Sequence, residues 1–163
     1  MAKEHPYADQ EEIMASELFN RMREFYDRSE LPQKVTKTLK EGAVAEVEFE
    51  GDDETYMMIK EGGRSHMRPG KPPKPEIYMK FSLEAVEWLM ALGGDSEEDI
   101  EEYVSRFGEC ILNPTPTRWI KFKLCTNVIT GARMGYFGMM KAGGRKALDL
   151  ALKMGLKIPA KFR

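Results

Sequence analysis

Few residues of the kinds that perform catalysis occur in this 163-residue chain, and their spacing matches no common catalytic motif. The two histidines, His5 and His66, have no serine or carboxylate at an informative spacing, and the GxSxG, HExxH and GxGxxG patterns are absent. Cys110 and Cys125 form no CxxC pair, which predicts reduced thiols rather than a metal site or a disulfide. We therefore expect no enzyme activity, no cofactor and no metal. An active site built from residues distant in the sequence is the alternative.

Two charged segments are explained by the ends of helices. Asp95–Glu102 places acidic side chains where a helix should begin, at the positive end of its dipole. The run Gly143–Lys146 lacks the full GxxxxGK[ST] spacing of a phosphate loop, and its two basic residues either attract an anionic headgroup or are solvated. Neither segment predicts a nucleotide or cation site.

Charge and hydropathy exclude further classes of partner. The net charge of −2 provides no broad field for nucleic acid, although the chain from Lys141 to Arg163 is locally basic. No apolar run approaches the roughly 18 residues of a membrane span, so stable membrane insertion is not expected. Because the N-terminal residues lack the order of a signal peptide, we expect a cytoplasmic location.

The spacing of apolar residues predicts one α+β domain over residues 1–163. Alternation typical of strands occurs in five segments, which are Ala43–Glu50, Thr55–Lys60, Ser65–Arg68, Ile77–Phe81 and Arg118–Cys125. Helical spacing occurs in Asp9–Arg28, which Pro32 should close, in the segment that Ser82 can cap, in the segment that starts at Asp95, and in Arg145–Met154. Consecutive strands favour a mostly antiparallel sheet of five strands with helices on one face.

The helix expected after Ser82 is apolar on nearly every side. Trp88, Leu89, Met90 and Leu92 make it nearly apolar all round. It must therefore be covered by the rest of the protein or by an apolar ligand.

The order of these elements resembles the sterol carrier protein type 2 family. The resemblance is carried by the hairpin AVAEVEFEGDDETYMMIKEGG, the strand-to-helix unit PEIYMKFSLEAVEWLMAL, the strand WIKFKL and the closing LALKMGL. It implies a five-stranded sheet covered by helices, with a hydrophobic tunnel between the layers for fatty acids, acyl-CoA, sterols or other lipids. The function that follows is binding or carriage of an apolar, lipid-like molecule.

The twelve methionines provide separate support for a pocket, since unbranched thioethers adapt to irregular apolar shapes. For any single methionine, core packing is the favoured explanation, and the support for a pocket comes from the methionines as a set. The residues expected to line the tunnel are the inward positions of the strands and the apolar faces of the helices: Met79, Phe81, Val86, Leu89, Met90, Ile120, Phe122, Met134, Phe137 and Met140.

Glycines at Gly131, Gly135 and Gly138 have two interpretations. They either permit a close helix contact or loosen a gate over residues 131–144 beside the pocket.

Two other functions stay open on the sequence alone. The same fold packed solid would serve as an interaction module, with a protein partner or as a homodimer, and a third interpretation is an accessory domain of a lipid-metabolising enzyme. An exposed Trp88 without an internal cavity would favour the module, and a continuous tunnel would favour the carrier.

Overall fold

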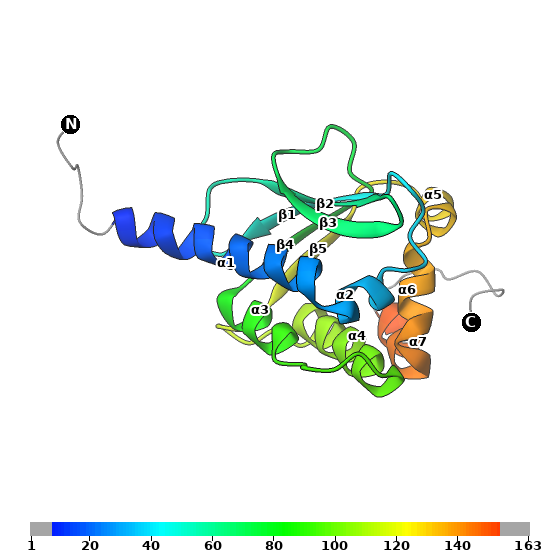
Figure 1. The fold of residues 1–163 in the computed structure, drawn as a ribbon. Coiled ribbons are helices and arrows are strands. Elements are labelled where there is room, and N and C mark those ends of the chain that lie inside the picture. The colour runs from blue at the N-terminus through cyan, green and yellow to red at the C-terminus, as the bar shows by residue number, and fades with distance from the viewer. Residues whose placement is uncertain (1–7, 154–163) are drawn as a thin grey trace.

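A five-stranded sheet forms one layer of the computed structural model, which describes residues 8–153 (Figure 1). Its strands lie in the order β3-β2-β1-β4-β5. Their bounds are β1 Val44–Phe49, β2 Tyr56–Glu61, β3 Arg64–Pro69, β4 Ile77–Phe81 and β5 Ile120–Leu124. Each bound lies within two residues of the strand that the sequence predicts.

The pairing of the strands is mixed and mostly antiparallel, as predicted. β1 pairs with β2, β2 with β3, and β4 with β5, all antiparallel. At the centre β1 and β4 run parallel, with Phe49 opposite Phe81. The hairpin of β2 and β3 is therefore inserted in the chain between two strands that are neighbours in the sheet.

Seven helices of the described chain cover one side of this sheet or its end (Figure 1). Their bounds are α1 Ala8–Arg28, α2 Glu30–Val35, α3 Leu83–Met90, α4 Glu97–Leu112, α5 Val128–Arg133, α6 Tyr136–Ala142 and α7 Gly144–Lys153. The sequence predicts that the last helix, α7, extends to Met154. Met154 lies outside the described residues, as do His5, Lys157, Lys161 and Arg163.

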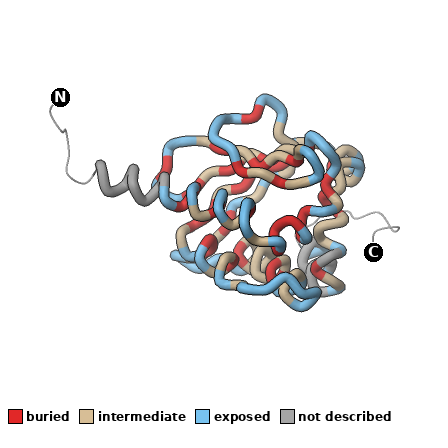
Figure 2. Tube along the Cα trace, viewed as in Figure 1, coloured by how far each residue is buried: buried red, intermediate tan, exposed pale blue. Residues whose placement is uncertain are grey.

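The core lies between the sheet and the helices. Ala45, Val47 and Phe49 of β1 are buried, while the residues between them are half-buried on the other face (Figure 2). β4 has the same alternation, which confirms the predicted inward positions of the central strands.

Serine caps begin the two helices that follow β4. The Ser82 hydroxyl oxygen accepts a hydrogen bond from the Ala85 amide at 3.2 Å. Ser96 and Asp99 form a reciprocal capping box at the start of α4. The Ser82 cap and the acidic helix start are thus where the sequence predicts them.

Pro32 does not close the first helix, and this prediction was wrong. α1 ends at Arg28, and Ser29 then caps a second helix, α2, in which Pro32 occupies the first turn. A proline is tolerated there because the amide that it lacks would have no partner within the helix.

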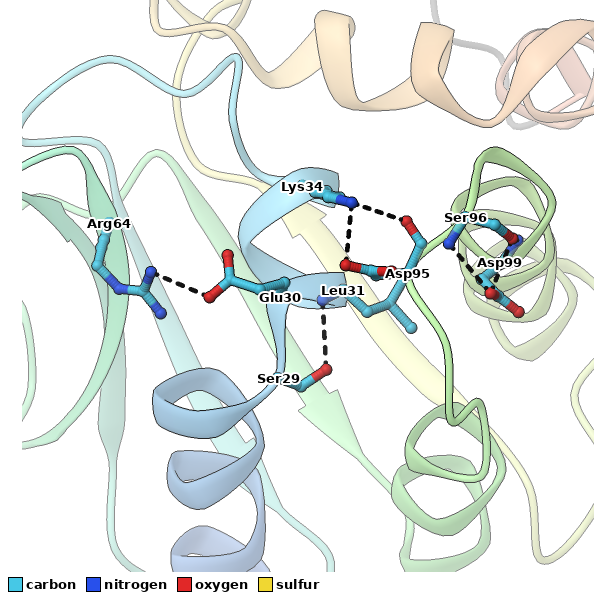
Figure 3. A network of polar contacts seen from close by, with 8 residues as sticks. All are labelled: Ser29, Glu30, Leu31, Lys34, Arg64, Asp95, Ser96 and Asp99. Atoms are coloured by element: carbon cyan, nitrogen blue, oxygen red, sulfur yellow. Dashed lines mark hydrogen bonds and ion pairs between the residues drawn. The ribbon is translucent and has the colours of Figure 1, made fainter.

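α2 is held at both ends by ion pairs (Figure 3). Glu30 pairs with Arg64 of β3 at 3.4 Å, and Lys34 pairs with Asp95 of the loop before α4 at 2.9 Å. Pairs this exposed contribute about 0 to 1 kcal/mol each. They connect α2 to β3 at one end and to the loop before α4 at the other.

The turn between α5 and α6 packs tightly against the loop after α2. Gly135 has a φ of +93°, and a Cβ built there would lie 1.9 Å from the Thr38 carbonyl oxygen. A Cβ on Gly138 would lie 2.7 Å from the Thr38 side chain. The Lys40 amide donates to the Met134 carbonyl at 2.9 Å. Of the two interpretations of these glycines, a close contact is what the structure shows at Gly135 and Gly138.

Candidate functional site

An apolar cavity of about 120 Å³ lies between the sheet and the helices. Its floor comes from β2, β4 and β5, and its roof from α1, α2, α4 and α6. The residues that line it are Tyr26, Val35, Thr36, Met58, Ile77, Met79, Phe81, Tyr103, Val104, Phe107, Gly108, Ile111, Phe122, Tyr136, Met139 and Met140. A tunnel through the molecule is not shown by the described residues.

The cavity approaches the surface on the side of α4, α6 and β5. Every lining residue from α1, α2, β2 and β4 is buried, whereas Phe107 and Ile111 of α4, Phe122 of β5 and the two methionines of α6 are half-buried. The partly exposed part of the wall therefore consists of large, flexible or aromatic side chains at one edge of the sheet.

Two tyrosine hydroxyls face each other in the buried part of the wall. Tyr26 of α1 and Tyr103 of α4 interact through their hydroxyl groups. Burial raises the pKa of Tyr26 to about 12 and moves the pKa of Tyr103 well above its usual value. Both groups are therefore neutral at physiological pH and can act only as hydrogen-bond donors or acceptors.

A third tyrosine connects the wall to β4. The Tyr136 hydroxyl lies 3.4 Å from the Glu76 carboxylate, which also accepts a hydrogen bond from the Val44 amide at 3.0 Å. Burial raises the pKa of Glu76 above its usual value, and the two hydrogen bonds oppose this effect. The contact fixes the start of α6 to the sheet.

A buried lysine lies beside the cavity without lining it. Lys60 of β2 donates from its ammonium group to the Thr36 carbonyl at 3.0 Å. Burial lowers the pKa of Lys60, and the nearby Glu41 carboxylate opposes the shift. Since Lys60 is outside the lining, the groups that border the cavity are apolar except for the hydroxyls of Thr36 and the three tyrosines.

Four of the ten residues predicted to line the pocket do so: Met79, Phe81, Phe122 and Met140. The other six lie elsewhere. Val86, Leu89, Ile120 and Phe137 are buried outside the lining, Met134 is half-buried outside it, and Met90 borders a separate open groove between α1 and the end of α3.

The protein itself covers the apolar helix α3. Val86 and Leu89 are fully buried in the core. The Trp88 ring lies beneath two guanidinium groups, with the central carbon of Arg118 at 3.9 Å from the ring centre and that of Arg106 at 5.0 Å. Trp88 is thus neither an exposed docking residue nor part of the cavity wall.

The helix that contributes most to the wall is α4, which the sequence did not assign to the pocket. Tyr103, Val104, Phe107, Gly108 and Ile111 lie on its inner face. The regular apolar stripe of α4 is visible in the sequence, and it was the available signal.

Other reactive groups in the described chain form no site. Residues 8–153 contain no group of three or more histidine, cysteine, aspartate or glutamate side chains placed to hold a metal ion. Both cysteines are free thiols, and burial raises the pKa of Cys110 to about 11. His66 lies on β3, where its Nε2 atom is 3.2 Å from the Glu61 carbonyl.

None of the helices in the described part of the chain is both long and apolar enough to cross a bilayer.

Comparison with known proteins finds similarity to a solved structure. No family model and no curated protein matches the chain. A solved structure titled "UbiJ-SCP2 Ubiquinone synthesis protein" is similar over 81% of this chain and 90% of that chain, at 11% sequence identity and a TM-score of 0.39. Its title names the family that the sequence resembles. The quinone synthesis in that title is a property of the neighbour.

Proposed function

We propose that this protein binds an apolar, lipid-like molecule in the cavity between the sheet and the helices, and carries it within the cytoplasm. The observation that carries the proposal is the cavity itself, which is apolar on nearly all sides and lies between the layers. The family resemblance of the sequence implies a ligand in the same place. Fatty acids, acyl-CoA and sterol-like molecules are the classes that it implies.

The chemistry of the wall supports binding without catalysis. Among the described lining residues there is no carboxylate, imidazole, thiol or amine, and the tyrosine hydroxyls are held neutral by burial. Affinity then comes from removing apolar surface from water, at about 0.8 kcal/mol for each buried CH₂ group. Action as a carrier rather than an enzyme is part of the proposal.

The ligand passes, in this proposal, between α4 and α6 at the β5 edge. The side chains on that side are half-buried, and Met139 and Met140 have the torsional freedom to rearrange around a guest. The α5–α6 turn itself is fixed by its contacts with Thr38 and Lys40. Access therefore depends on side-chain movement more than on a hinge at Gly135.

Native mass spectrometry of the purified full chain tests the proposal, first for a co-purified molecule and then after incubation with apolar probes of graded size. Val104→Phe adds volume to a lining position of α4 and should reduce the fraction of bound protein. Ile129→Phe is the matched control, because Ile129 is 71% exposed on α5 outside the cavity. Absence of any bound probe, or equal binding by both variants, would contradict the proposal.

Association with a protein partner or a second copy stays a prediction from the sequence.

A further inference from the structure

The size of the cavity limits what it can hold in this conformation. An engineered protein cavity of about 150 Å³ lined by leucine, isoleucine and phenylalanine accommodates benzene. The cavity here measures about 120 Å³ and has a similar apolar lining. It therefore matches one six-membered ring, and a long acyl chain exceeds it.

The contacts around α6 oppose enlargement of the cavity from that side. The Thr38 hydroxyl donates to the Gly135 carbonyl at 2.9 Å, and the Lys40 amide donates to the Met134 carbonyl at 2.9 Å. Gly138 has no room even for a methyl group against Thr38. Because these contacts hold the start of α6 near the loop after α2, the compact cavity is the shape offered to a ligand.

The tyrosine pair leaves one hydrogen-bond donor in the wall. Tyr26 and Tyr103 each carry one hydroxyl hydrogen, and the interaction between the two hydroxyls uses one of them. Both residues line the cavity, so the pair can present a hydroxyl hydrogen to a ligand. Stacking of Tyr103 on Phe25, with ring centres 6.3 Å apart, restricts where its hydroxyl points. A buried donor of this kind favours a ligand with an oxygen acceptor.

The wall also selects against charge. No ammonium or guanidinium group lines the cavity among the described residues, and Lys60 is engaged with the Thr36 carbonyl. A carboxylate placed there would lose its hydration without a counter-ion.

We propose that the cavity selects a compact, neutral molecule of about one ring that carries an oxygen acceptor, and that the Tyr26–Tyr103 pair donates a hydrogen bond to this oxygen. The inference rests on the proposed function, because it specifies the ligand of the same cavity. It differs from the long-chain ligands that the sequence resemblance implies.

The test compares two ring molecules of equal size on the full chain, cyclohexanone and methylenecyclohexane, by following amide shifts of Gly108 and Phe122 in NMR titrations. Hexadecanoate serves as the long-chain probe. Dissociation constants of the order of 0.1 to 1 mM are expected for the rings, since they have few atoms. Saturable shifts at cavity residues with both rings, and weaker or no shifts with hexadecanoate, are the expected result.

The donor is tested by the double variant Tyr26→Phe/Tyr103→Phe, which keeps both rings. The ratio of the two dissociation constants is compared between the unaltered chain and the variant, because the solvation of the free ligands cancels in that comparison. The ratio should move about fivefold against the ketone, as expected for one net hydrogen bond. Tyr78→Phe is the control, because its hydroxyl interacts with Glu48 on the other face of the sheet. Its ratio should equal that of the unaltered chain.

Three outcomes overturn the inference. An unchanged ratio in a folded double variant removes the tyrosine donor. Tighter binding of hexadecanoate than of either ring removes the size limit while the proposed function stands. Failure of all three probes to bind removes the proposed function as well. Should the double variant fail to fold, Tyr26→Phe alone and the size series on the unaltered chain decide the result.

Discussion

Alanine substitutions at Gly135 and Gly138 should have different costs, because the two glycines approach different parts of Thr38. At Gly135 the added Cβ meets the Thr38 carbonyl oxygen at 1.9 Å, and the backbone already has a φ of +93°. At Gly138 it meets only side-chain atoms of Thr38, at 2.7 to 2.8 Å. A backbone obstacle cannot rotate away, whereas a side chain can be removed.

The contacts give the magnitudes. For Gly135→Ala, the left-handed conformation costs about 1 to 2 kcal/mol, and lifting the turn away from Thr38 breaks two hydrogen bonds worth about 1 kcal/mol each. The expected loss in free energy of unfolding is about 3 to 4 kcal/mol. For Gly138→Ala, overpacking costs about 1 to 3 kcal/mol, and the better helix propensity of alanine recovers about 1 kcal/mol.

Urea unfolding of both variants, alone and combined with Thr38→Gly, gives two double-mutant cycles. Thr38→Gly removes the atoms that obstruct position 138, so Gly138→Ala should show a favourable coupling of about 1 to 2 kcal/mol. Gly135→Ala should show a coupling near zero beyond the shared hydrogen bond. Equal coupling at the two positions, or a loss below about 1 kcal/mol for Gly135→Ala, would refute this reasoning.

Three further predictions concern the cavity wall and the residues that hold it. Met139→Ala and Met140→Ala should weaken ligand binding, which a titration measures. Because both methionines are half-buried, the loss in free energy of unfolding, measured in urea, should be below the roughly 2 to 5 kcal/mol expected for a fully buried methionine. Ligand binding should slow amide exchange over residues 131–144 more than over the hairpin at 43–60, which its own ladder holds in both states; equal protection would contradict this. The pKa of Glu76 is higher in the folded chain than its ordinary value of 4.5, because burial disfavours the charged carboxylate. Ionisation of Glu76 therefore lowers the free energy of unfolding as pH rises from 4.5 through the raised pKa. Glu76→Gln should flatten that decline in urea midpoints, and an unaltered slope would show that other groups cause it.

The sheet is predicted by the sequence because the alternation of apolar residues within each strand indicates which face of that strand is buried. The alternation in β1 and β4 places Val47 and Met79 in the core whatever lies next to them. The start of α2 is not predicted in the same way. Its capping residue, Ser29, directly follows the last residue of α1, and Pro32 is as compatible with a first turn as with a stop.

The candidate site is only partly predictable from the sequence. Helical spacing shows that a helix has an apolar face, but it does not show which strands that face packs against. α3 and α4 both have apolar residues at helical spacing, and the sequence favoured α3 because it is apolar on nearly every side. In the fold, Val86 of α3 packs into the solid core, and Phe107 of α4 lies over the cavity. Which helix lies over which strand is decided by connections and by contacts such as Arg118 on Trp88. None of these is local in sequence.

The parallel pairing of β1 with β4 sets an order for the formation of the domain. Ala45 meets Ile77 only after the chain between them has folded back, whereas β1 and β2 are joined by a short turn. Because its connections are short, we expect the β1–β2–β3 meander to form first and β4 to dock on it later. Since β4, α4, β5 and α6 contribute residues to the cavity wall, we expect the wall to be complete only after these later segments have packed. We therefore expect a molecule that fits the cavity to bind the completed fold and to stabilise the whole domain by mass action.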